Sequence, residues 1–350
     1  MYRITLDKIA SAAKNVEIGR DVTLSDSIIS KEGYLVAVEV LNDKAIYNEL
    51  ENRSGRMMRL KPGDRIAGVL GIRQALQGYS GHVPETLAKG DRLNVLNLGG
   101  VLGSCTSHAP NVGRPFEVEV LGAVLHFPHL ERRISEPAHI GMNALPEAGP
   151  INGTAPIIAV LGTCMNAGKT MAACQIIHEF TRKGLRVGAA KVTGISLERD
   201  VLLMRDHGAA EAFSFNDAGL VTTTPETAPG STRRIIAALN RAETDVIVLE
   251  FGDGLVGEYG VQAILSQKDM TARIRATILC ANDPVGALGG VPLLQRRFGL
   301  KTTVVTGPVT DNDVGRKFIE KDLEVPAANA MMAPAQLAGH VLKAVFANEE

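Results

Sequence analysis

The chain has 350 residues, of which 45% are hydrophobic and 21% charged, so it carries enough apolar sequence for two folded domains. Its formal net charge of −1 gives no overall attraction to nucleic acid or to an anionic membrane, and neither is expected as a partner. No apolar run approaches the roughly 18 residues that a membrane-spanning helix needs, and the first residues contain no apolar signal core.

The four cysteines are widely separated, at positions 105, 164, 174 and 280. Such spacing is typical of free thiols in a reducing compartment and does not suggest a disulfide framework. We therefore expect a cytoplasmic protein.

Residues 1–133 are predicted to form a β-rich domain, either a small barrel or a sandwich of short strands. Two of its strand-like segments contain the same Gly-Asp-Arg sequence, in which Gly63 or Gly90 can adopt the positive φ of a turn. This repetition indicates either an internal duplication or a common way of entering a strand. The strand candidates, rich in Val, Ile and Leu, lie at 34–41, 60–71, 87–103 and 116–127.

Two pairs of potential metal ligands lie in this first domain, Cys105 with His108 and His126 with His129. The spacing of each pair resembles half of a zinc site. The first pair, however, falls in a polar loop, and the second flanks Pro128 at the end of a strand. A structural role is therefore the simpler interpretation, and a metal site is the alternative.

Residues 134–156 contain several prolines and glycines without periodicity, a composition typical of a linker. From 157 to 350, apolar strands alternate with amphipathic helices, which predicts an α/β domain with a mostly parallel sheet covered on both faces. The expected strands lie at 157–162, 186–192, 245–254, 275–283 and 301–307, and the expected helices at 169–184, 196–208, 231–242, 285–298 and 334–349.

The sequence VLGTCMNAGKTMAAC, residues 160–174, joins the first of these strands to the first helix. A glycine-rich turn at that point presents backbone N–H groups to an anion, and the helix N-terminus adds the positive end of its dipole. Lys169 would reach the β- and γ-phosphates of a nucleotide, and Thr170 would ligate Mg²⁺ through its hydroxyl. The predicted nucleotide-binding residues are Gly162, Thr163, Cys164, Met165, Asn166, Ala167, Gly168, Lys169 and Thr170.

Five residues, one more than in the common P-loop pattern, separate the two glycines of this loop. With that spacing, GTCMNAGKT resembles the G-T-x-x-x-x-G-K-T loop of dethiobiotin synthetase and related P-loop ligases. The resemblance extends over about residues 155–340. The segment AAKVTG places Lys191 at the end of the second strand, and ERDVLLMRD offers Asp200 soon after it. The third strand ends in VLEFGDG, which offers Glu250.

The resemblance implies a P-loop NTPase fold and an ATP- and Mg²⁺-dependent enzyme. Such an enzyme would activate a small carboxylate or carbamate by phosphoryl transfer for attack by an amine. Lys169, Lys191 and Glu250 would be its catalytic residues, and Thr170, Asp200 and Glu250 would hold the metal. Ligands of open α/β sheets bind beyond the carboxyl ends of the strands, where these side chains are expected to converge. Related enzymes often dimerise, so a homodimer is expected.

Each assignment has a structural alternative. Lys191 could be a lysine that reaches solvent from a strand end, and Asp200 could be a charge favoured by the helix dipole. Asp253, in the same turn as Glu250, could be only a turn former. Glu250 itself is harder to explain without a function, because an unpaired carboxylate at the end of an apolar strand is costly.

The chain also departs from the ligase pattern. The turn after the third strand reads F-G-D-G where the family has smaller residues, and dethiobiotin synthetase lacks a β-rich domain of this size. A different substrate is therefore expected, and two other functions remain open. One is a small-molecule kinase with a hydroxyl acceptor; the other is a nucleotide-hydrolysing switch or metallochaperone-type NTPase. ANDP at 281–284 is a poor match to the N-K-x-D of a GTPase, which counts against the switch.

Overall fold

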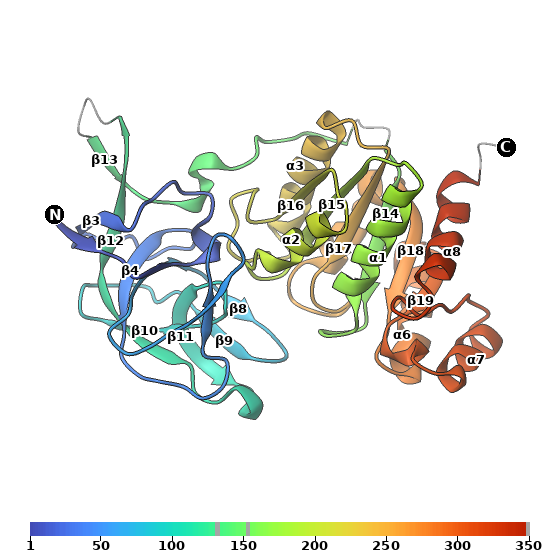
Figure 1. The fold of residues 1–350 in the computed structure, drawn as a ribbon, viewed down its shortest axis with the longest axis horizontal. Coiled ribbons are helices and arrows are strands. Elements are labelled where there is room, and N and C mark those ends of the chain that lie inside the picture. Colours follow the sequence, from blue (N-terminus) through green and yellow to red (C-terminus); the bar gives the residue numbers. More distant parts are fainter. Residues whose placement is uncertain (130–133, 152–154, 348–350) are drawn as a thin grey trace. The chain divides into compact units, whose positions relative to one another are not determined.

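The computed structural model describes residues 1–129, 134–151 and 155–347, and the chain forms two compact units (Figure 1). Neither unit is continuous in sequence, so the chain passes from one to the other five times, after residues 145, 194, 199, 214 and 222. The first unit comprises Met1–Leu145, Ile195–Arg199 and Phe215–Thr222, and the second Pro146–Gly194, Asp200–Ser214 and Thr223–Glu350.

This division differs from the sequence-based one, which placed 1–133, 134–156 and 157–350 in a domain, a linker and a second domain. Residues 134–145 belong to the first unit because Ala138 and Ile140 are fully buried in its core. Val221, from a segment assigned by sequence to the second domain, lies in the same core. Part of the predicted linker, 152–154, lies outside the described residues.

The first unit is rich in short strands, as predicted, and it contains short 3₁₀ helices at Ser11–Ala13 (η1), Pro110–Val112 and Ile140–Asn143. Its strands are β1 (Tyr2–Thr5), β2 (Lys8–Ile9), β3 (Asp21–Ser25), β4 (Leu35–Val40), β5 (Glu49–Glu51), β6 (Met57–Arg59), β7 (Arg65–Leu70), β8 (Arg73–Gln74), β9 (Tyr79–His82), β10 (Arg92–Val95), β11 (Val101–His108), β12 (Phe116–His129) and β13 (Ile134–Pro137).

Five of these strands close into a barrel. β12 pairs with β4, β4 with β7, β7 with β11, β11 with β10, and β10 with β12 again. The alternation of side chains along β4 sends Val36, Val38 and Val40 to one apolar cluster, whereas Leu35 and Ala37 belong to a second cluster on the other face. Closure leaves these five strands few unpaired edges, which favours the barrel over the sandwich.

The two Gly-Asp-Arg segments form equivalent turns. Gly63 and Gly90 have φ values of 85° and 91°. In each turn the aspartate accepts a hydrogen bond from the backbone three residues earlier, Asp64 from Lys61 and Asp91 from Ala88, both at 2.7 Å. Each glycine N–H donates to the end or middle of a barrel strand, β4 or β12, and these two strands pair with each other. The repetition seen in the sequence is therefore a structural repetition as well.

Replacing Gly63 or Gly90 with alanine should destabilise the protein by about 1 kcal/mol, because an L-residue is strained at positive φ. An alanine Cβ at either position would meet no atom within 4 Å, so the effect would come from the backbone alone. Gly149→Ala is the matched control, because Gly149 also has open space around its Cβ and no positive φ. Urea denaturation would contradict the argument if all three variants unfolded at the same midpoint.

The second unit is built around six parallel strands in the order β16-β15-β17-β14-β18-β19. The chain starts at β14, near the middle, and fills first one side of the sheet and then the other. Its elements are β14 (Ile157–Gly162), α1 (Lys169–Arg182), β15 (Val187–Thr193), α2 (Arg199–Asp206), β16 (Glu211–Ser214), α3 (Ala228–Arg241), β17 (Val246–Phe251), α4 (Val261–Leu265), α5 (Lys268–Thr271), β18 (Ile274–Cys280), α6 (Pro284–Phe298), β19 (Val304–Thr306), α7 (Asp313–Asp322) and α8 (Pro334–Phe346).

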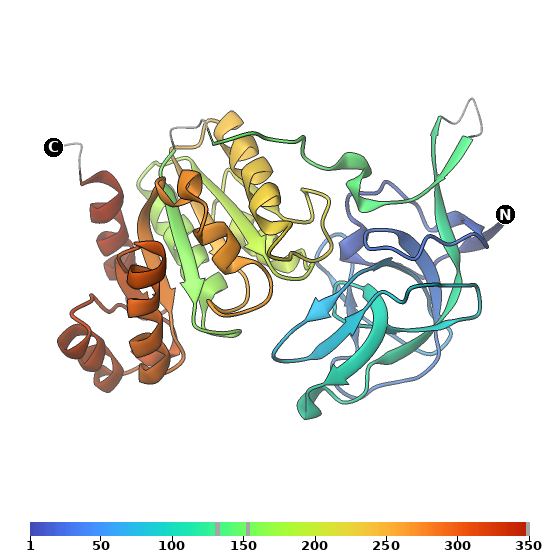
Figure 2. The same cartoon turned by 180° about the vertical axis from the view of Figure 1, so that it is seen from behind.

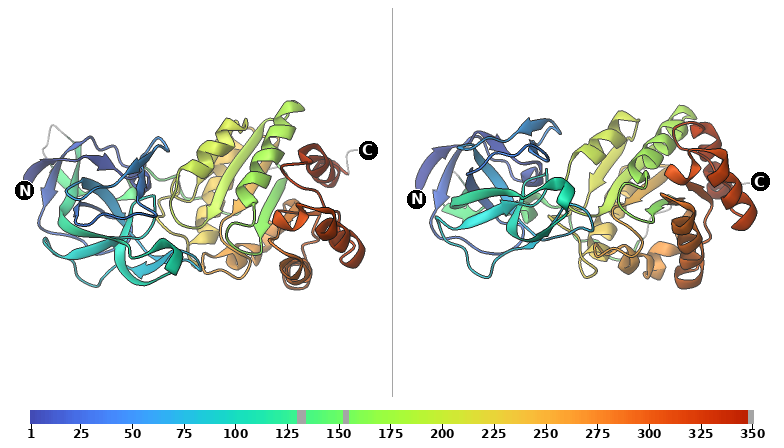
Figure 3. Two further views of the ribbon diagram at one scale, coloured as in Figure 1. Left: turned by 60° about the horizontal axis from the view of Figure 1, so that its bottom comes forward. Right: turned by 90° about the horizontal axis from the view of Figure 1, so that it is seen from below.

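Helices cover both faces of this sheet. The main apolar cluster joins alternate residues of β14, β15, β17 and β18 to α1, α2 and α8, so these helices share one face (Figure 1). α3 packs on β15 and β16 on the opposite face, which Figure 2 shows from behind. Figure 3 gives two further directions in which the sheet lies between its helices. The predicted parallel α/β architecture is therefore confirmed. Among the described residues, no helix has the length and apolarity to cross a membrane.

Candidate functional site

The loop Gly162–Thr170 leaves the carboxyl end of β14 and leads into α1, the position that its sequence predicts. Two residues of the loop have left-handed backbone, Asn166 with φ 60° and Gly168 with φ 89°. These conformations turn successive N–H groups inward, as an anion-binding nest requires. Gly168 occupies the N-cap of α1 with no side chain over the helix end, so an anion can approach the free N–H groups of the first turn.

Lys169 lies folded over this loop. Its Nζ donates to the carbonyl oxygen of Cys164 at 2.8 Å, and the side chain is only 7% exposed. Gly162 makes room for it, because a Cβ there would lie 2.8 Å from Lys169 Cδ. The Lys169 ammonium group therefore lies beside the nest, where it donates to a backbone carbonyl oxygen. A phosphate oxygen can take the place of that carbonyl as its acceptor.

Glu250, the last but one residue of β17, lies between the loop and the neighbouring strand. It is in register with Val160 of β14 on one side and Lys191 of β15 on the other. Thr170 Oγ1 donates to Glu250 Oε1 at 2.8 Å. The second oxygen, Oε2, is buried and has no hydrogen-bond partner among the described residues. The structure therefore joins two of the three predicted metal ligands directly.

The third predicted ligand, Asp200, is engaged differently. Its Oδ2 forms a short ion pair with Nζ of Lys191, and both side chains are largely buried. Asp200 lies in the first turn of α2, and Lys191 near the end of β15. The pair thus brings together two residues predicted for different roles, one for the metal and one for an anion.

A further carboxylate, Asp253, belongs to the same site. It follows β17 in a turn that packs directly on the nucleotide loop, with Leu255 N–H donating to the Gly162 carbonyl oxygen at 2.9 Å. Gly254 approaches Thr163 so closely that a Cβ would lie 2.7 Å from its carbonyl oxygen. Asp253 has φ 72° and is 8% exposed. Neither of its buried oxygens makes a hydrogen bond of good geometry to a described residue.

The sequence predicts Asp253 as a turn former, and its backbone does form a turn. The feature that bears on its side chain is the glycine at 257, since a Cβ there would lie 1.9 Å from Asp253 Oδ2. The carboxylate is thus accommodated by the absence of a side chain at position 257, and the nearby Gly254 N–H offsets the effect of its burial only in part. A buried, unsatisfied charge of this kind is costly to folding and is characteristic of functional sites.

Burial sets the protonation of this cluster. It raises the pKa of Glu250, and nearby Asp200 raises it further, against the opposing effects of Lys191, Thr170 and Lys169. Burial also raises the pKa of Asp253, partly offset by the Gly254 N–H. For Lys169, burial lowers the pKa, and the charge of Glu250 counteracts that effect. The site therefore holds each of these three groups closer to its neutral form than water would.

The donor set fits a magnesium ion bound with phosphate. Mg²⁺ prefers oxygen ligands and in nucleotide sites takes few of them from the protein. The Thr170 hydroxyl and the unpartnered Glu250 Oε2 supply two such oxygens. Within the described part of the chain, no three His, Cys, Asp or Glu side chains form a site that would hold a metal without a nucleotide.

The other predicted loop residues differ in their surroundings. Thr163 packs against Gly286 and Gly290 in the first two turns of α6, and Cys164 Sγ accepts a 3.0 Å hydrogen bond from Asn282. Met165 is half-buried, Asn166 exposed and Ala167 buried. The ANDP segment places Asp283 as the N-cap of α6, where it accepts from Gly286 N–H, a structural role for that aspartate.

The cysteine and histidine pairs of the first unit do not form a metal site within the described residues. Cys105 lies on β11 with its Sγ donating to the Ser107 carbonyl oxygen, and His126 lies on β12 opposite Glu136. The side chain of His129 lies outside the described part of the structure.

Comparison with known proteins finds only distant similarities to solved structures. No family model and no curated protein matches the chain. A DUF1611 family protein from Anabaena variabilis matches with 10% identity and a TM-score of 0.42, covering 59% of this chain and 64% of its own. The signal recognition particle receptor FtsY from Elizabethkingia anophelis, in complex with GDP, matches with 16% identity and a TM-score of 0.40, over 59% of this chain and 68% of its own.

A LAO/AO transport system kinase matches with 15% identity and a TM-score of 0.37, over 56% of this chain and 62% of its own. The chain therefore spans less than two thirds of this kinase and of the DUF1611 protein. Nothing in these similarities points to dethiobiotin synthetase specifically.

Proposed function

We propose that this chain binds ATP with Mg²⁺ in the loop Gly162–Thr170 and transfers the γ-phosphoryl group to a small-molecule acceptor. The observation that carries the proposal is the pair formed by Thr170 and the buried Glu250, whose second oxygen is left unpartnered beside the loop. Such an oxygen needs a cation, and a magnesium–nucleotide complex supplies one at that place.

Phosphoryl transfer asks the protein mainly for positioning and charge neutralisation. The N–H groups of the loop would hold the phosphates, and Lys169 would leave the Cys164 carbonyl to meet the β- and γ-oxygens. Thr170 and Glu250 would hold Mg²⁺, which withdraws charge from the phosphate oxygens. Lys191, which is in register with Glu250 across the two strands, would face the acceptor.

A carboxylate or carbamate acceptor is the first candidate, and it rests on the resemblance to the P-loop ligases. Its oxygen would attack the γ-phosphorus as ADP leaves, giving a mixed anhydride. An amine would then displace phosphate from that anhydride and form a C–N bond. No proton has to be removed from a carboxylate before it attacks, so Lys169 and Lys191 would suffice to balance the charges.

A hydroxyl acceptor is the second candidate, and Asp253 is the observation that favours it. A hydroxyl must lose its proton as it attacks, and a buried carboxylate without a hydrogen bond of good geometry is a suitable base. The same base could activate water, as a nucleotide-hydrolysing switch would need.

The experiment combines thermal unfolding with product analysis. Mg·ATP at about one hundred times its Kd should stabilise the protein by about 2.7 kcal/mol, and Mg·GTP serves as the comparison. Panels of carboxylates and alcohols are then added, acyl phosphates are trapped with hydroxylamine, and phosphate esters are detected by ³¹P NMR. A hydroxamate supports the ligase and an ester the kinase. If neither nucleotide raises the unfolding temperature, the proposal fails.

A further inference from the structure

The segment Ile195–Arg199 connects the two members of the buried ion pair. Lys191 precedes it on β15, and Asp200 follows it directly in α2. Yet the segment itself is packed into the first, β-rich unit. Asn97 Nδ2 donates to the Ser196 carbonyl oxygen at 2.8 Å, and Ser196 N–H donates to the Val221 carbonyl oxygen at 2.9 Å.

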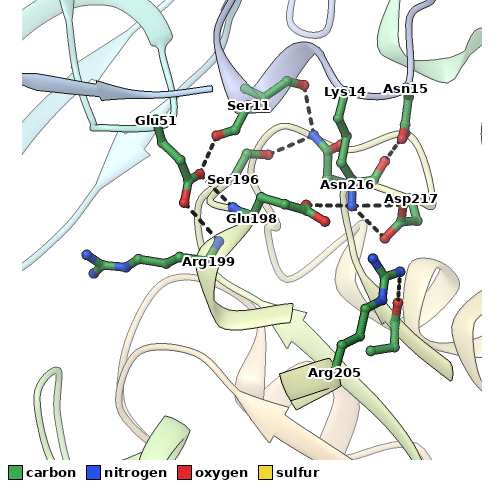
Figure 4. A network of polar contacts seen from close by, with 12 residues as sticks. Ser11, Lys14, Asn15, Glu51, Ser196, Glu198, Arg199, Arg205, Asn216 and Asp217 are labelled. Carbon is green, nitrogen blue, oxygen red and sulfur yellow. Dashed lines mark hydrogen bonds and ion pairs between the residues drawn. The ribbon is translucent and has the colours of Figure 1, made fainter. Parts of the chain in front are cut away.

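Glu51, at the end of β5, contacts the backbone of the two residues that precede Asp200 (Figure 4). Its Oε2 accepts from the backbone N–H of Glu198 at 2.7 Å, and its Oε1 from that of Arg199 at 2.8 Å. Ser11 Oγ, from η1, donates a third, short hydrogen bond to Oε2. Glu51 is fully buried, so its two oxygens are satisfied by these three donors.

These hydrogen bonds cap the N-terminus of α2. The N–H groups at the start of a helix have no partner within it, and a capping side chain normally comes from the residue just before. In α2 the capping carboxylate comes instead from Glu51, 148 positions away from Arg199 in the chain. Its negative charge also lies at the positive end of the helix dipole.

The side chain of Glu198 is held separately. Lys14 Nζ pairs with Glu198 Oε2 at 2.7 Å and with both oxygens of Asp217 at 2.9 Å (Figure 4). Lys14 therefore fixes the side chain of the residue before α2, whereas Glu51 fixes the backbone of its first turn. Asp200 is the next residue after Arg199, so its position depends directly on that backbone.

We propose that Glu51 is a positioning residue for the Lys191–Asp200 pair, acting through the first turn of α2. The inference rests on the proposed function in one respect, that Lys191 faces the acceptor. Glu51 would thereby influence where the acceptor-binding lysine points, although it touches no reacting group itself. Loss of the Glu51 carboxylate would let Asp200 shift and would weaken its ion pair with Lys191.

The test measures the reactivity of Lys191 in the full chain without any nucleotide. An acylating reagent such as N-hydroxysuccinimide acetate reacts with free amines, and mass spectrometry of peptides gives the rate at each lysine. Glu51→Gln keeps the size of the side chain but turns an amide N–H₂ toward one of the two backbone N–H donors. Lys191 should then react about fivefold faster or more, by about as much as in Asp200→Asn.

Three controls separate positioning from general loosening. Lys169 is buried within the nucleotide loop and should stay slow in every variant. Glu49→Gln makes the same chemical change on an exposed residue of the same strand and should have no effect. The double variant Glu51→Gln/Asp200→Asn should match Asp200→Asn alone, because Glu51 would act only through Asp200.

Ser11→Ala provides a milder change in case Glu51→Gln does not fold. It removes only the hydroxyl that donates to Glu51, and a smaller acceleration at Lys191 is expected. An unchanged rate at Lys191, equal acceleration at Lys169, or additive effects in the double variant would each overturn the inference. Because no nucleotide is present, such a result would not bear on the proposed phosphoryl transfer, which has its own test.

Discussion

Lys169→Met abolishes the nucleotide response of this protein while leaving its nucleotide-free fold at least as stable; that is the result we expect. The lysine is 7% exposed, and its Nζ donates a hydrogen bond to the Cys164 carbonyl oxygen. Burial lowers its pKa, which means that the folded protein disfavours the charged form. Methionine has a similar length and no charge, so it removes this penalty without opening a cavity.

The loss of function should be large because the charge acts in a buried site. Removal of one well-placed hydrogen-bond donor from a transition state typically costs about 10²–10³ in rate, and Lys169 would contribute a full charge as well. We expect turnover to fall by at least about 10³-fold and the stabilisation by Mg·ATP to disappear. Lys183→Met, at the exposed C-cap of α1, is the matched control. Equal nucleotide affinity in wild type and Lys169→Met would refute the assignment of the loop.

Asp253→Asn should stabilise the fold and remove the activity together. The carboxylate is buried without a good hydrogen bond, so its charge costs stability that the neutral amide does not. Asparagine is also among the few residues that tolerate positive φ, so the turn at φ 72° is retained. We expect a gain of roughly 1 kcal/mol without nucleotide and a loss of about 10²–10⁴ in turnover if Asp253 is the base.

The stability of the protein should depend on pH in a direction that follows from the pKa of Asp253. Burial raises the pKa of Asp253 in the folded state above its value in the unfolded chain. The protonated carboxyl is therefore the form that the fold favours, and its contribution to stability is present at low pH and declines as pH rises through the folded-state pKa. In Asp253→Asn, which has no carboxyl group at this position, stability should fall less as the pH rises over this range. Turnover should show the opposite trend and rise over the same pH range, because the base acts in its charged form.

Denaturation curves and rates measured across this range would check both trends. Asp322→Asn, on the exposed end of α7, is the control for a change of net charge. A destabilised Asp253→Asn variant would mean that the carboxylate has a structural partner after all. A stabilised variant with full activity would remove Asp253 from the chemistry and with it the main support for a hydroxyl acceptor.

Local patterns were sufficient to predict the nucleotide loop and the strands around it. A buried strand, a glycine-rich turn and a helix occur in immediate succession at 157–182, and each is specified by its own residues. The sequence does not predict β16, because its four residues, EAFS, contain too short an apolar run. α4 and α5 are similarly short, with five and four residues. Glu250 and Lys191 were identified because each ends an apolar run, which marks the active edge of a parallel sheet.

Contacts that join distant parts of the chain could not be predicted in this way. Nothing in the sequence near Glu51 indicates that it accepts hydrogen bonds from residues 198 and 199. The sequence around Asp253 predicts its turn, but its burial depends on how the turn packs against Thr163 and on the glycine at 257. Such features follow from tertiary packing, which periodicity and local propensity do not encode.

The repeated passage of the chain between the two units bears on how the protein is made. Synthesis on the ribosome proceeds from the N-terminus, and many domains fold as soon as they emerge. The β-rich unit cannot do so, because its core includes Val221 and Glu51 awaits its partners at 198 and 199. It must remain incomplete until residue 222 has been added, when β14 and α1 are already present. For the same reason, cutting the gene near residue 150 would leave the first fragment without Val221 and the other late segments of its core. The second fragment would carry residues 195–199 and 215–222 without the unit into which they pack, so attempts to express the units separately should give aggregating material.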